Sequence, residues 1–206
     1  MFNGKKNIKL KNNNGIAITL NNQKVITYSN VPNDVSLIYK IFTDWLTLCK
    51  DIQATGVARR KVNFPESISE TCVAIVQKYD FLNQKSISSV LSTAKFSTSF
   101  DCFDPIKGDR IQVKASSTKL DLTSYGPRSK YDILIFADFY NNGNIDGTFI
   151  LYNIPINLVI NAFVNSSTTA QQQAVAGKRP RMSMKKIINA NNIVGTKHKL
   201  TPGKIL

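Results

Sequence analysis

Residues 99–117 read SFDCFDPIKGDRIQVKASS and hold two runs of strand-forming residues with turn residues between them. Asp104-Pro105 and Lys107-Gly108-Asp109 supply the turn, because proline, glycine and aspartate favour the backbone angles of a tight reversal. The second run, residues 110–114, alternates between polar and apolar side chains. The stretch therefore predicts a β-hairpin.

The second strand of this hairpin has two unlike faces. Successive side chains on a strand point to opposite sides, so Gln112 and Lys114 share one face and the apolar residues between and beside them share the other. The apolar face is expected to be core. Asp101, on the first strand, then comes opposite the pair Gln112 and Lys114. An acid, an amide oxygen and an ammonium are thus gathered, which makes a candidate site for metal binding and proton transfer.

Asp101, ten intervening residues and then Gln112-Val113-Lys114 resemble the PD-(D/E)xK nuclease core, in which an acid and a (D/E)-x-K tripeptide lie on adjacent strands. Over roughly residues 64–188 the chain is similar to small type II restriction endonucleases. The resemblance rests on this core together with PESISE at 65–70, SYGP at 124–127 and GKRPR at 177–181. It implies an α/β (α+β) fold with a restriction-endonuclease-like core, a central mixed sheet of four to five strands flanked by helices.

One position departs from the family pattern. Gln112 stands where the tripeptide has an acid, and it offers a metal a carbonyl oxygen without a charge. Another carboxylate must then supply the charge. The resemblance makes Glu70 the first candidate, because in this family a helix before the core strands often presents a glutamate to the metal. Glu66 is the second, because positions four apart lie on one face of the helix predicted from Pro65 to about Tyr79.

The resemblance also implies the chemistry of the site. Mg²⁺ would be held by Asp101, Glu70 and either the Gln112 oxygen or the Val113 carbonyl, with Lys114 orienting or deprotonating the attacking water. Asp104 is the alternative to Asp101. The catalytic residues expected on this basis are Asp101, Gln112, Lys114 and Glu70.

Length and charge agree with a DNA-binding protein. The 206 residues suit a single domain, and 27 basic against 13 acidic residues give a formal net charge of +14, which attracts polyanions. Double-stranded DNA is the leading partner. No membrane partner and a cytoplasmic location are expected, because no apolar run approaches the ~18 residues that span a bilayer and the N-terminus has no apolar leader segment.

The expected organisation is one nuclease domain, residues 1–206, with three parts. A peripheral hairpin occupies residues 1–32, the catalytic core residues 33–165 and a basic DNA-contacting segment residues 166–206. In the core, a helix begins at Asp34 and carries Trp45 on its apolar stripe, and the nearly continuous apolar run 131–139 predicts a central strand. Asp132 and Asp138, near the ends of that run, are interpreted as capping or edge carboxylates.

Candidate DNA contacts are basic and hydroxyl-bearing residues near the motif and in the basic clusters. The competing interpretation is a solvated charge run for residues 59–61 and a disordered basic tail that binds phosphates nonspecifically for the cluster near residue 180. Gln171 to Gln173 are interpreted as a linker. The candidates are Arg59, Arg60, Lys61, Ser116, Ser117, Ser124, Tyr125, Arg128, Lys178, Arg179 and Arg181.

The function implied by the resemblance is that of a type II restriction endonuclease, which hydrolyses double-stranded DNA at a short palindromic site with Mg²⁺. A homodimer would match the symmetry of such a site. A cognate DNA methyltransferase would be its genetic partner, without physical contact. Two alternatives stay open: a structure-selective nuclease of the same fold, similar to Holliday-junction resolvases, and a non-catalytic basic nucleic-acid-binding protein.

Overall fold

A computed structural model describes the backbone of residues 8–11, 15–20 and 23–27, and the full structure of residues 34–56, 62–81, 100–104, 106–107, 109–127, 129 and 131–206. Four of the predicted DNA contacts, Arg59, Arg60, Lys61 and Arg128, lie outside the described residues. None of the helices within these ranges combines the length and hydrophobicity needed to cross a bilayer.

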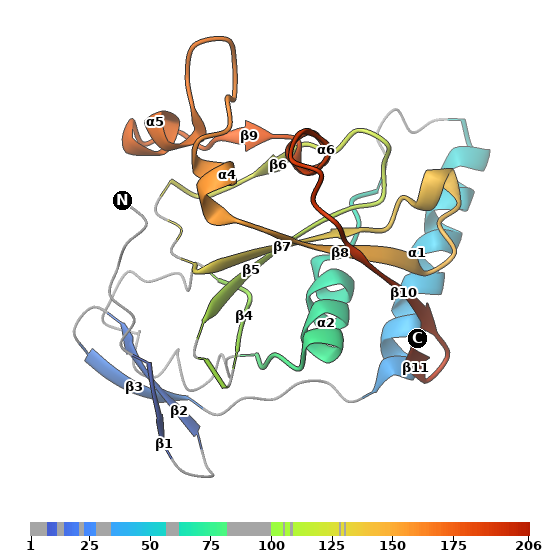
Figure 1. The fold of residues 1–206 in the computed structure, drawn as a ribbon. Helices are drawn as coiled ribbons and strands as arrows, with labels where there is room; N and C mark the ends of the chain where they lie inside the picture. Colours follow the sequence, from blue (N-terminus) through green and yellow to red (C-terminus); the bar gives the residue numbers. More distant parts are fainter. Residues whose placement is uncertain are drawn as a thin grey trace.

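The centre of the fold is a six-stranded mixed sheet in the order β11-β10-β8-β7-β5-β4 (Figure 1). β5 runs parallel to β7, and the other neighbours are antiparallel. This confirms the predicted fold class and the central place of the apolar run, which forms β7. The sheet has more strands than expected, because the C-terminal residues add β10 and β11. The strands are β4 Cys102–Phe103, β5 Arg110–Ser116, β7 Ile133–Asp138, β8 Thr148–Ile154, β10 Thr196–Thr201 and β11 Lys204–Ile205.

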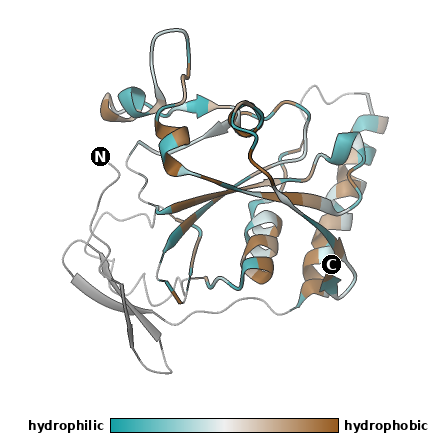
Figure 2. Ribbon diagram, in the orientation of Figure 1, coloured by the Kyte–Doolittle hydropathy of each residue, from teal (hydrophilic) through white to brown (hydrophobic). Residues whose placement is uncertain are grey.

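Different elements cover the two faces of this sheet (Figure 1). Helices α1 (Val35–Ala54) and α2 (Glu66–Gln77) lie on one face. The other face is covered by the short helices α4 (Ile156–Ile160), α5 (Ala170–Val175) and α6 (Met184–Ala190) and by the pair β6 (Thr123–Ser124) and β9 (Arg181–Met182). Figure 2 shows hydrophobic residues along the central strands and on α1 and α2. The result is a three-layer arrangement with the sheet in the middle.

Each face of the sheet has its own hydrophobic core. Along β7, Ile135 and Ala137 pack in the core under α1 and α2, while Leu134 and Phe136 pack in the core on the other side. Ile111 belongs to the first core, as the alternation in the sequence predicted. A strand buried on both faces explains why the run 131–139 is almost uniformly apolar.

The two long helices place the segment that borders the site. The Asp34 side chain caps α1 by accepting the Leu37 N–H at 3.0 Å. Trp45 is 7% exposed and its Nε1 donates to the Asn63 carbonyl at 3.0 Å, which confirms it as a core residue. Because α2 begins directly after Pro65, this bond fixes the approach to the first two turns of α2, which carry Glu66 and Glu70.

The two ends of the chain hold more regular structure than predicted. The expected N-terminal hairpin corresponds to β2 (Gly15–Leu20) and β3 (Gln23–Thr27), and β1 (Ile8–Lys11) adds a third antiparallel strand. The glutamines interpreted as a linker belong to α5, where Thr169 and Gln172 form a capping box. A threonine three positions before a glutamine is the sequence pattern of such a capping box, so the sequence did indicate the start of this helix.

Candidate active site

The Asp101 carboxylate lies against the outer edge of β5. β4 pairs with β5 only at Cys102 opposite Ile111 and Phe103 opposite Arg110, so among the described strands none continues along this edge past Ile111. Asp101 continues along this edge, shifted by one residue from the register of β4: its N–H donates to the carbonyl of Ile111, the residue opposite Cys102, at 2.8 Å, and its carboxylate accepts the Val113 N–H at 2.7 Å. The acid also contacts the Gln112 side chain, so the two meet across the hairpin as the strand alternation predicted.

A groove of about 520 Å³ runs along this edge. Its lining includes the consecutive residues 113–116, whose side chains alternate between the two faces of the sheet, so the groove lies at the edge, where both faces are accessible. The structure brings together here the following predicted site residues: Glu66, Glu70, Asp101, Val113, Lys114, Ser116, Ser117 and Ser124.

Three carboxylates line this groove, of which those of Glu70 and Asp101 are partly buried and that of Glu66 is exposed. The pKa of Glu70 is raised from 4.5 to about 7, chiefly by burial and also by the nearby carboxylates of Asp101 and Glu66, while Lys114 acts against them. Burial also raises the pKa of Asp101, opposed by the hydrogen bond from Val113, by Lys114 and by the Gln112 side chain. The negative charge of the groove is thus poorly compensated by the protein alone.

Gln112 holds Asp101 by a hydrogen bond from the side away from the groove. It is 7% exposed and lies outside the set of residues that line the groove. Its side-chain nitrogen donates to Asp101 Oδ2, the oxygen that also accepts the Val113 N–H, and to the Val113 carbonyl at 3.4 Å. In this arrangement the amide nitrogen, rather than the oxygen expected as a metal ligand, faces the acid.

The other aspartates near the motif have structural partners. Asp104 Oδ1 accepts the N–H groups of Ile106 and Lys107 at 2.8 and 3.0 Å, which stabilises the turn of the hairpin. Asp132 forms a two-pronged pair with Arg110 at 2.9 and 3.0 Å. Asp138 pairs with Lys185 at 2.8 Å. Of Asp101 and Asp104, only Asp101 lines the groove.

The donor set suits a hard divalent cation. Within the described residues no three Asp, Glu, His or Cys side chains converge as a complete metal site. The groove offers the carboxylates of Asp101 and Glu70 and the backbone of Val113. Mg²⁺ is commonly held by one or two carboxylates, with water and substrate phosphate completing its shell. The residues present therefore fit Mg²⁺ when the substrate supplies further oxygens.

The predicted DNA contacts fall into two groups. Ser116, Ser117 and Ser124 border the groove, and Lys178, Arg179 and Arg181 are exposed. β9 pairs with β6, with Arg181 opposite Ser124, so the basic segment lies beside the groove. The sequence carried no signal for this pairing, because each strand has only two residues.

Tyr125 is placed differently from the expectation of a DNA contact. It is 5% exposed in the second core, where its ring stacks with Tyr131 and its hydroxyl donates to Met184 Sδ at 2.9 Å. Burial raises the pKa of its phenol well above the usual range. In this structure Tyr125 is a packing residue, because the β6–β9 pairing turns it inward.

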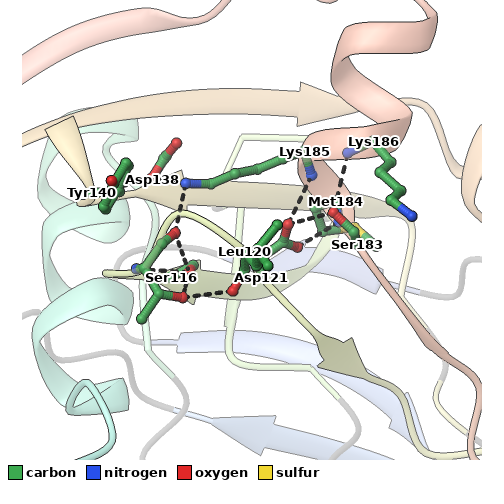
Figure 3. Close-up of polar contacts among 10 residues, drawn as sticks. Ser116, Leu120, Asp121, Asp138, Tyr140, Ser183, Met184, Lys185 and Lys186 are labelled. Carbon is green, nitrogen blue, oxygen red and sulfur yellow. Dashed lines mark hydrogen bonds and ion pairs between the residues drawn. The ribbon is translucent and has the colours of Figure 1, made fainter. Parts of the chain in front are cut away.

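Two residues that the sequence did not single out connect the groove to α6 (Figure 3). Asp121 is 6% exposed and accepts hydrogen bonds from the Ser183 hydroxyl and from the N–H groups of Met184 and Lys185. Lys185 extends back from α6 to the Thr118 carbonyl at 2.9 Å and to Asp138 at 2.8 Å. Only the fold could reveal these contacts, because the partners are 47 or more positions apart.

Comparison with known proteins also indicates a restriction endonuclease. The family model described as Bsp6I restriction endonuclease matches residues 32–190, which include all residues that line the groove. The type II restriction enzyme Bsp6I of Bacillus sp. (strain RFL6) is 33% identical over 138 residues, which cover 65% of this chain and 70% of that protein. No solved structure matches the chain.

Proposed function

Since this chain belongs to the Bsp6I restriction endonuclease family and is a type II site-specific deoxyribonuclease, we propose that the groove along β5 is its active site and that it cleaves double-stranded DNA there with Mg²⁺. The observation that carries the proposal is the position of Asp101. Its carboxylate is held on the edge of β5, where no strand of the described residues pairs beyond Ile111, in a groove that Glu70 and Lys114 also line.

The metal ligands proposed from this chain are Asp101, Glu70 and the Val113 carbonyl. Type II restriction enzymes generally use divalent metal ions, and a bound Mg²⁺ would polarise the scissile phosphate and acidify a bound water. Glu70 must lose its proton to serve as a ligand, and its pKa of about 7 allows this at slightly alkaline pH. Gln112 keeps Asp101 in place by donating a hydrogen bond to it.

Lys114 is the proposed electrostatic and proton-handling residue. It lines the groove, and it opposes the rise in pKa of both Asp101 and Glu70, so its ammonium acts on the same space as the carboxylates. There it orients the attacking water and stabilises the negative charge that develops on the phosphate oxygens.

DNA binding is proposed for the basic segment and for the rim of the groove. The exposed Lys178, Arg179 and Arg181 would contact phosphates or guanine edges, with Ser116, Ser117 and Ser124 nearer the cut. Arg59, Arg60, Lys61 and Arg128 remain proposed contacts outside the described residues. We further propose that the enzyme acts as a homodimer on a short palindromic site and that a cognate methyltransferase is encoded with it. The chain is proposed to divide into a peripheral part (residues 1–32), a catalytic core (33–165) and a basic DNA-contacting segment (166–206).

Digestion of a mapped plasmid with Mg²⁺, followed by sequencing of the fragment ends, tests the proposal. Discrete fragments with one repeated end sequence are expected, and chelation of the metal should abolish them. Asp101→Asn and Lys114→Met should both stop cleavage. Asp44→Asn, an exposed change on α1 at a residue that does not line the groove, is the matched control and should cut normally. Equal cutting by all four proteins would show that the groove is not the active site.

A further inference from the structure

The segment that leaves β5, residues 117–122, borders the groove and is called here the rim loop. Its side chains alternate sharply in exposure: Leu120 is 84% exposed, Asp121 6% and Leu122 69%. Leu122 also lines the groove. Two large apolar side chains are thus presented to solvent beside the proposed catalytic residues.

The protein holds the rim loop firmly from behind (Figure 3). Asp121 anchors its middle to the first turn of α6. Lys185 anchors its start by donating to the Thr118 carbonyl at 2.9 Å, while its ammonium is paired with Asp138 and lies 4.8 Å from the centre of the Tyr140 ring. The Thr118 hydroxyl donates to the Leu120 carbonyl at 2.7 Å. The outward position of both leucines is therefore built into the fold.

The surroundings of the leucines favour DNA as the occupant. The loop is continuous with a groove that is bordered by hydroxyl groups and by Lys114, and the exposed Lys119 is adjacent to Leu120. The chain as a whole carries a net charge of +14. A second copy of the chain seated on these leucines would cover the groove that the substrate has to enter. Exposed apolar side chains at the border of a site usually mark an interaction surface.

We infer that the rim loop is a DNA-contacting element in which Leu120 and Leu122 pack against the apolar parts of the DNA, such as thymine methyl groups, sugars or the faces of a base step. This rests on the proposed function and adds a contact to it that carries no charge. Because the backbone of the rim loop is already held in place, little backbone freedom is lost on binding, so the contact would add affinity efficiently.

The test compares Leu120→Ser/Leu122→Ser with the parent enzyme in DNA binding, measured without divalent cations over a series of salt concentrations. Loss of two buried leucine contacts should weaken binding by about tenfold or more. The slope of log affinity against log salt should stay that of the parent, because the leucines neutralise no phosphate. Lys119→Ala should instead reduce that slope by about 1.

The matched control is Leu37→Ser/Leu48→Ser, which makes the same two changes at leucines that are 51% and 48% exposed on α1. It should bind DNA like the parent. If the rim-loop variant binds DNA as tightly as the parent and the parent cuts plasmid DNA, the inference about the leucines is wrong but the proposed function stands. A change in sedimentation of the DNA-free variant would also overturn it, since a second copy would then be the occupant. A parent that neither cuts nor binds DNA would overturn the proposed function as well.

Discussion

The carboxylate of Asp101 accepts the N–H of Val113 at 2.7 Å, at the point where β5 loses its neighbour β4. A strand edge needs a partner for each buried N–H group, and for Val113 a side chain supplies it, at a position where none of the strands in the described ranges pairs with this edge. The same bond fixes the acid beside the strand that carries Lys114. The requirements of the sheet edge and of the proposed chemistry are therefore met by one contact.

Asp101→Asn tests whether this acid is needed for its charge. The asparagine oxygen can still accept the Val113 N–H, so the melting temperature should stay close to that of the parent. Loss of a metal ligand should lower the single-turnover cleavage rate by at least about 100-fold. Rapid-quench cleavage assays and thermal unfolding measure the two effects, with Asp44→Asn as the control. Cleavage at the parental rate would remove Asp101 from the site.

Glu70→Gln should separate stability from activity. In the folded protein the pKa of Glu70 is raised from 4.5 to about 7, so between these values the folded state binds more protons than the unfolded state and stability falls as the pH rises. Glutamine removes this penalty. The metal-free variant should therefore be more stable than the parent by about 1–2 kcal/mol near pH 8, with solvent screening allowed for, and hardly different near pH 4.

Urea unfolding at both pH values measures this effect of Glu70→Gln. In cleavage assays the same variant should be impaired, and Mg²⁺ should raise the melting temperature of the parent more than that of the variant. Glu66→Gln, one helical turn earlier, is the matched control. If Glu66→Gln shows the larger loss of cleavage, the roles proposed for the two glutamates are exchanged.

Gln112→Glu tests the departure from the family motif. A glutamate here would set a second carboxylate against Asp101 at a position that is 7% exposed, and it would remove the hydrogen bond that Gln112 donates. The metal-free protein should lose about 1–3 kcal/mol of stability. Mg²⁺ should restore more stability to this variant than it adds to the parent, as followed by thermal unfolding with and without the ion. An unchanged metal-free melting temperature would mean that Gln112 does not support Asp101.

Lys185→Met tests the anchor of the rim loop. Lys185 and Asp138 are each 17% exposed, so removal of the ammonium leaves a largely buried carboxylate without its partner. The free energy of unfolding should fall by about 1–3 kcal/mol. DNA affinity and the single-turnover rate constant should both fall, because the loop that carries Leu120 and Leu122 loses an anchor. Asp138→Asn combined with Lys185→Met should cost less than the sum of the two single changes, because both remove the same pair.

The matched control for Lys185→Met is Lys186→Met, since Lys186 is the next residue and is exposed. It should match the parent in stability and in cleavage rate. Equal losses in the two variants would show that positive charge on α6, and not the contact with Asp138 and Thr118, is what matters.

Much of the sheet and of the proposed site followed from short-range patterns in the sequence. The alternation along 110–114 placed Asp101 opposite Gln112 because strand geometry is the same wherever a strand occurs. The continuous apolar run 131–139 indicated β7 because a strand covered on both faces has no polar side. The start of a helix at Asp34 and the place of Trp45 on its apolar face could be predicted from the pattern of that helix alone.

What only the tertiary structure decided are the contacts between distant segments. The pairing of β6 with β9 turned Tyr125 into the core and brought Arg181 beside Ser124, and the charged residues 196–201 joined the sheet as β10. Asp121 and Lys185 acquired partners far away in the chain. A sequence window reports the local preferences of its own residues, whereas these contacts depend on how separate elements pack, which no single window contains.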